Sequence, residues 1–144
     1  MATIKSYTTV EQSRKLAEIL SIESADMYWL NKYTDLIETK YKPFIIDKSN
    51  KYIDFFKSYA VAVDNNEIIP CWSLAVLLEE IPDTIVNMVG EGLKLHIDKD
   101  GFQYSLFYEN EYTGNMFEIE TELYDDMIDA CYEMIIKLHE QKLL

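Results

Sequence analysis

The sequence predicts a single α+β domain in which an antiparallel meander of three to four strands is covered on one face by helices, including a long C-terminal helix. Residues 93–121 alternate between apolar and polar side chains and are divided by two groups of turn residues, as in half-buried antiparallel strands. Residues 124–138 repeat apolar side chains every three or four positions, as in a helix with one buried face. The length of 144 residues suits one domain.

The first helix is expected to begin after Thr9, because Gln12 stands three residues later and can complete a capping box. Leu16 and Leu20 lie on the apolar face of that helix. Residues 24–30 are expected to form either a second short helix or an ordered loop.

The middle of the chain is less regular. Pro43 interrupts any helix there, residues 44–46 fit a short strand, and residues 52–56 fit a helix. Residues 59–63 predict a strand that ends in an Asp-Asn-Asn turn, and the chain extends again over residues 67–69.

The densest apolar segment runs from Ile68 to Pro82 and is predicted to be a short buried helix on which the other elements pack. Pro70 suits a helix start, Ser73 is a candidate N-cap, and Pro82 ends the helix. Trp72 is expected to cover the core at the mouth of this helix.

Three strands follow, with a hairpin turn at residues 98–101 and a second turn at residues 113–115. The third strand spans residues 116–121. Asp125 is expected to cap the start of the last helix, with Asp126 and Asp129 in its first turn and Lys137 near its end, as the helix dipole favours.

The net charge of −13 is concentrated in the second half of the chain. Residues 1–72 carry nine Lys or Arg and ten Asp or Glu, whereas residues 73–144 carry four and sixteen. Direct binding of nucleic acid requires clustered cations, which the second half lacks. Five lysines in the first half are interleaved with aromatic residues and are read either as a weak nucleic-acid strip or, preferably, as solubilising groups. They are Lys40, Lys42, Lys48, Lys51 and Lys57.

The reactive side chains predict no catalytic, cofactor or metal site. Cys71 and Cys131 stand in apolar contexts without metal-ligand spacing, so we expect two buried free thiols, a disulfide between them being the alternative. His96 and His139 are expected at the surface. The Asp-Lys-Asp-Gly sequence at residues 98–101 looks superficially like the start of a calcium loop. The fifth and sixth positions of such a loop require an oxygen ligand and a glycine, but here they are Phe102 and Gln103.

The start of the chain has no apolar signal-like segment, and its longest uninterrupted apolar run is Leu74–Leu78. That run is far shorter than the roughly 20 residues a membrane helix needs. We therefore expect a cytoplasmic protein that does not enter a membrane.

Acidic residues crowd the polar face of the second and third strands. Like charges opposite each other on neighbouring strands cost stability, so the crowding serves solubility or a cationic partner. The expected partner-binding residues are Glu109, Glu111, Glu118, Glu120 and Glu122.

Three blocks, residues 24–29, 69–82 and 129–138, together resemble a family of small uncharacterised proteins from gut-bacterial genomes, often associated with prophages or other mobile elements. The resemblance implies an origin and a fold type but no mechanism.

The sequence thus favours a non-catalytic, cytoplasmic protein-interaction module of a phage or mobile element. One alternative is an acidic decoy that mimics DNA and occupies a nucleic-acid-binding host protein. The other is a small hydrolase or transferase that uses carboxylates, which requires a deep pocket with two carboxyl groups of raised pKa.

Overall fold

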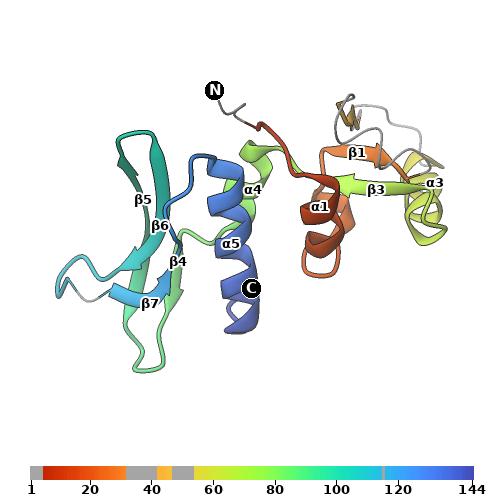
Figure 1. The fold of residues 1–144 in the computed structure, drawn as a ribbon. Coiled ribbons are helices and arrows are strands. Elements are labelled where there is room, and N and C mark those ends of the chain that lie inside the picture. Colours follow the sequence, from red (N-terminus) through yellow and green to blue (C-terminus); the bar gives the residue numbers. More distant parts are fainter. Residues whose placement is uncertain (1–4, 32–41, 47–53, 115) are drawn as a thin grey trace. The chain divides into compact units, whose positions relative to one another are not determined.

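The structure is a computed structural model that describes residues 5–31, 42–46, 54–114 and 116–144, with the backbone alone at 54–57 and 116–118. The chain divides into two compact units, one of residues 7–76 and one of residues 1–6 with 77–144. Each unit is described by itself (Figure 1). The expectation of a single domain stays a prediction.

The helices and strands of the described residues fall in both halves of the chain, and four strands follow one another before the last helix. In order they are α1 (Val10–Leu16), the 3-10 helix η1 (Ile22–Ser24), β1 (Met27–Leu30), β2 (Phe44–Ile45), α3 (Asp54–Asp64), β3 (Ile68–Cys71), α4 (Leu74–Glu80), β4 (Thr84–Val86), β5 (Gly92–Asp100), β6 (Gln103–Glu109), β7 (Met116–Glu120) and α5 (Met127–Glu140).

The unit of residues 7–76 contains an antiparallel sheet in the order β2-β1-β3. The capping box before α1 is confirmed, because Thr9 Oγ1 accepts from the Gln12 N–H and Gln12 Oε1 accepts from the Thr9 N–H. Residues 27–30 form a strand, so the prediction of a helix or loop there is wrong. Four apolar residues are too few to show a period, and pairing with β3 decides their conformation.

The prediction of one helix over Ile68–Pro82 is wrong in its first half, where β3 precedes α4. Pro70 fits a strand because of its position in the register, opposite Tyr28. The hydrogen bond from Asn31 N to Glu67 O marks a bonded pair. Bonded and non-bonded pairs alternate along an antiparallel ladder, so the pair of Tyr28 and Pro70 is a non-bonded one. Its nitrogen therefore faces away from β1. Among the described strands β3 is an edge strand, where proline removes no hydrogen bond of the sheet. Ser73 Oγ accepts from the Val76 N–H at 3.4 Å, as expected for an N-cap.

The fully buried Thr8 links three elements of this unit. Its hydroxyl lies 2.7 Å from Ser13 Oγ and accepts from the Trp72 N–H at 3.2 Å. Its N–H donates to Trp72 O, and its carbonyl accepts from Trp29 Nε1. The segment before α1 is thereby fixed to β1 and to the end of β3.

The predicted strand over residues 59–63 is instead part of α3. Tyr59 and Val63 stand four residues apart, which places them on one face of a helix. Tyr59 is buried and its hydroxyl donates to Ile22 O at 2.9 Å. A five-residue apolar run does not by itself distinguish a strand from a buried helix.

The unit of residues 77–144 contains the predicted antiparallel meander, in the order β4-β5-β6-β7. The turn at residues 98–101 joins β5 to β6, with Gly101 at a φ of 63°. Leu106 and Tyr108 face the core and are fully buried. Helix α5 packs against β6 and β7 (Figure 1), so the prediction of a sheet covered by the C-terminal helix is confirmed.

The N-cap of α5 is Asp126, and the prediction of Asp125 is wrong. Asp126 is 8% exposed, and its two carboxylate oxygens accept from the N–H groups of Ile128 and Lys5. The Asp125 carboxylate instead accepts from Gln103 Nε2. The Lys5 side chain also pairs with Asp129 at 2.7 Å, which fastens the first described residue of the chain to α5.

The apolar stripe of α5 is confirmed as core. Its fully buried members are Ile128, Ala130, Cys131, Met134, Ile135 and Leu138.

Most of the predicted basic strip lies outside the described residues, at Lys40, Lys48 and Lys51, as does the side chain of Lys57. Residues 52–53 of the predicted helix over 52–56 lie outside them too, while Asp54 begins α3.

Replacing Trp72 with alanine is expected to lower the free energy of unfolding by about 3–5 kcal/mol, as for other buried large aromatic residues. The side chain is 0% exposed, and its Nε1 donates to Ser24 Oγ at 2.9 Å. Chemical denaturation of the two proteins measures the difference. The control is Tyr112→Ala at a side chain that is 98% exposed, where a change within about 0.5 kcal/mol is expected. A loss below about 1 kcal/mol for Trp72→Ala would contradict its place in the core.

Candidate functional site

The predicted acidic residues lie around β6 and β7. Glu109 ends β6 and is half-buried, Glu111 lies exposed in the turn that follows, and Glu120 ends β7 and is exposed. Glu122 is exposed beyond the strand, and the side chain of Glu118 lies outside those described. Because β6 and β7 are antiparallel, Glu109 and Glu111 lie at the turn between the two strands, whereas Glu120 and Glu122 lie at the other end of β7.

The alternation in the sequence predicts that these glutamates face one another across the two strands. The register does not place them opposite one another. Glu109 lies opposite Met116, and Glu120 lies opposite Phe107. An irregularity between Phe107 and Glu109 shifts the pairing, which moves like charges apart and lowers their repulsion.

Two of the glutamates lie near a lysine and a histidine of β5. Lys94 Nζ lies 3.5 Å from Glu111, and His96 Nε2 lies 3.9 Å from Glu109. The His96 ring stacks on Phe107 with centroids 5.3 Å apart. Because Lys94 and Glu111 are both more than half exposed, water screens their attraction, and both remain available to a partner.

Helix α5 fixes the backbone at the end of β7. Lys137 Nζ donates to Glu120 O at 2.6 Å, and Glu133 accepts from the Glu122 N–H at 3.1 Å. Burial raises the pKa of Glu133, but hydrogen bonds from Lys137, Tyr124 and the Glu122 N–H outweigh burial, so the pKa lies below its ordinary value. Glu133 is therefore ionised at neutral pH, unlike a general acid.

Large apolar side chains stand exposed in the turns of this sheet. The exposed fractions are 101% for Met88 and 78% for Val89 between β4 and β5, 91% for Phe102 between β5 and β6, and 98% for Tyr112 between β6 and β7. Adjacent strands run in opposite directions, so the first and third of these turns lie at the same end of the sheet (Figure 1). Sequence reasoning missed them, although the apolar pair inside the turn sequence Asn-Met-Val-Gly was a visible signal.

Both thiols are free and buried, as predicted. Burial raises the pKa of Cys71 to about 11, although hydrogen bonds with Thr8 and Ser13 oppose the shift. Burial likewise raises the pKa of Cys131 to about 12. Neither group supplies the thiolate that a nucleophile or metal ligand requires.

Within the described residues, no three or more histidine, cysteine or acidic side chains group as a metal site. Among the same residues, no helix has both the length and the apolar character needed to span a bilayer.

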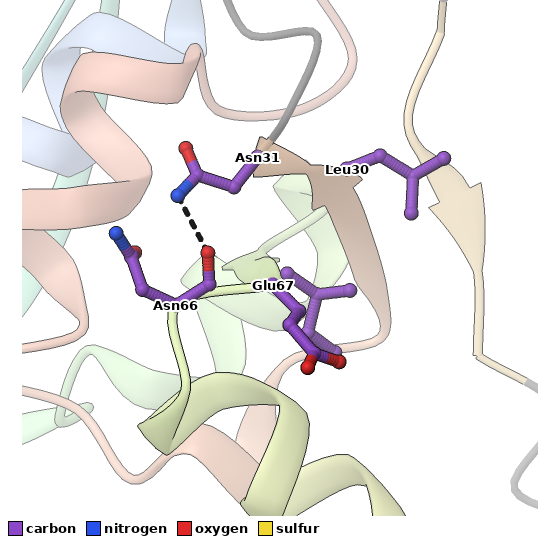
Figure 2. Close-up of a pocket in the computed structure, with 5 residues that line it drawn as sticks. Leu30, Asn31, Asn66 and Glu67 are labelled. Carbon is purple, nitrogen blue, oxygen red and sulfur yellow. Dashed lines mark hydrogen bonds between the residues drawn. The ribbon is translucent and has the colours of Figure 1, made fainter.

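A hollow of about 450 Å³ lies where β1 ends and β3 begins (Figure 2). Asn31 Nδ2 donates to Asn66 O at 2.6 Å across it, and Asn31 Oδ1 accepts from Arg14 at 3.1 Å. The Asn31 amide is thus engaged by the protein itself, and among the described residues that line the hollow Glu67 alone has a carboxylate. The lining residues are Leu30, Asn31, Asn66, Glu67 and Ile68.

Comparison of the chain with protein-family models, with curated proteins and with solved structures finds no match. Function is therefore inferred from the residues and contacts described above.

The native protein is expected to react slowly with a thiol reagent at pH 8, and to react at both cysteines once denatured. Raised pKa values leave little thiolate at Cys71 and Cys131 in the folded state, and burial blocks access. Absorbance with a chromogenic disulfide reagent measures the rate. Ser6→Cys places a thiol at an exposed position and should react at once. Fast reaction of the unsubstituted native protein would contradict this picture of the thiols.

Proposed function

We propose that the protein is a non-catalytic protein-interaction module whose partner binds the sheet of residues 77–144. The observation that carries the proposal is the set of nearly fully exposed apolar side chains in its turns, Met88, Phe102 and Tyr112. Exposed aromatic and methionine side chains are characteristic of protein interfaces, where their burial supplies binding energy.

The charge of this unit indicates a cationic partner surface. Residues 77–144 carry sixteen acidic side chains and four lysines. Glu111 is exposed in the turn that carries Tyr112, and Glu120 and Glu122 are exposed at the other end of β7. Complementary charge of this kind mainly accelerates association and selects the partner.

The reactive groups that the structure describes favour binding over catalysis. The buried thiols have raised pKa values. The described lining of the hollow beside β1 has one carboxylate, Glu67, where a hydrolase that uses carboxylates needs a pair. In line with the resemblance of its three sequence blocks, we further propose that the module belongs to a phage or other mobile element and acts in the cytoplasm.

Affinity capture of the tagged intact chain from its native host, followed by mass spectrometry, is expected to recover a stoichiometric protein partner. Reversing two charges with Glu120→Lys and Glu122→Lys should weaken binding of that partner about tenfold or more, because it removes attraction and adds repulsion. Binding of the purified partner to each variant is measured by calorimetry at two salt concentrations.

The matched control is Glu79→Lys with Glu140→Lys, which makes the same change in net charge at exposed helical positions. Equal effects of the two double variants, or capture of no stoichiometric partner, would overturn the proposal. A partner that is itself a basic nucleic-acid-binding protein, held in a strongly salt-dependent manner, would favour the decoy alternative.

A further inference from the structure

Among the residues that the structure describes, none pairs with the outer backbone groups of strand β4. Antiparallel pairing aligns Ile85 with Leu93, between hydrogen bonds from Leu95 N to Asp83 O and from Asn87 N to Glu91 O. Because bonded and non-bonded pairs alternate, Ile85 exchanges bonds with β5. The N–H and C=O groups of the residues on either side, Thr84 and Val86, therefore point away from β5.

No other strand within the described residues pairs with this side of β4, which is the first strand in the order β4-β5-β6-β7. Thr84 is exposed, and Val86 is 57% exposed. Natural edge strands are commonly protected by charged side chains or proline. The opposite edge, β7, has Glu118 and Glu120 in its sequence, whereas β4 has neither a charged residue nor a proline.

We propose that the β4 edge binds an extended, basic segment of the partner protein, which adds to the sheet as a further strand. This inference rests on the proposed function and names the chemistry of its partner. Main-chain hydrogen bonds to Thr84 and Val86 supply the pairing, as in other cases of strand addition. Since β4 is three residues long, the backbone hydrogen bonds are few, and contacts with Met88 and Val89 in the following turn contribute the remaining binding energy.

Charge selects a basic segment over a second copy of this chain. Asp83 and Glu91 flank the strand and its turn, and the unit has sixteen acidic residues against four lysines. Pairing β4 with β4 of another copy would bring two such units together and cost repulsion. In a segment that alternates lysine or arginine with β-branched residues, the basic side chains pair with the acidic groups and the β-branched side chains pack on the apolar ones.

The experiment is a selection of random seven-residue peptides displayed against the intact chain. The enriched peptides are expected to alternate basic and β-branched or aromatic residues, with no proline in their interior. With a synthetic copy of such a peptide, amide exchange followed by NMR should slow at Thr84 and Val86. The amides of Ile85 and Leu93, which face each other within the sheet, should be protected with and without peptide.

The decisive variant is Val86→Pro. It removes the outward N–H of Val86 but leaves the bonds between Ile85 and Leu93, and edge strands tolerate proline where the nitrogen faces solvent. Peptide binding should weaken about tenfold, as expected for the loss of one backbone hydrogen bond and its alignment. The control is Leu123→Ala, at a 47% exposed side chain that follows the opposite edge strand β7, and it should bind normally. Protection of Ile85 and Leu93 shows that the variant remains folded.

The inference is overturned if no peptide is enriched, if the enriched peptides are acidic or helical, or if Val86→Pro binds them as well as the unsubstituted chain. It is also overturned if sedimentation shows a dimer that Val86→Pro dissociates, because the occupant is then a second copy. If Glu120→Lys with Glu122→Lys weakens the native partner while Val86→Pro does not, the proposed function stands and this inference alone fails.

Discussion

The buried side chain and backbone of Thr8 fix the geometry on which the unit of residues 7–76 depends. Four hydrogen-bonding neighbours, Ser13, Trp29, Cys71 and Trp72, converge on this one residue. A buried polar group costs free energy unless it is paired, so the contacts stabilise the fold only in this one arrangement. Packing alone tolerates many arrangements of apolar side chains. The hydroxyl and carbonyl of Thr8 therefore specify how α1 meets β1 and β3.

The unit of residues 77–144 has a comparable anchor. The Tyr108 ring is fully buried, and its hydroxyl donates to Pro82 O at 2.6 Å. Asp126 similarly holds both the start of α5 and Lys5. With one face of the meander committed to this core, the acidic side chains of β6 and β7 are left to the other face and the turns. The negative charge that supports the proposal of a binding surface is thus a consequence of how the strands of this sheet bury their apolar residues.

How much of the candidate site follows from the sequence differs between its parts. The acidic positions, such as Glu120, are readable because alternation assigns each residue of a strand to a face. Which charges oppose each other is not readable, because the irregularity opposite Glu109 changes the register without changing the composition. The free edge of β4 is still harder to predict from the sequence. Three residues, Thr84 to Val86, carry no periodicity of their own, and their outward groups are defined by the pairing of Ile85 with Leu93.

The sequence by itself determined the elements whose signals are local and repeated. The β5–β6 hairpin combines alternation with a glycine-containing turn, and α5 repeats its apolar stripe over 14 residues. Tertiary structure decided the short segments. Residues 59–63 form helix and residues 27–30 form strand. Each run is compatible with both conformations until packing covers its apolar side chains and, for the strand, until β3 pairs with its backbone. Pro70 shows the same dependence, because a proline is acceptable in a strand only where its nitrogen faces away from the ladder, and only the register of β1 with β3 establishes that.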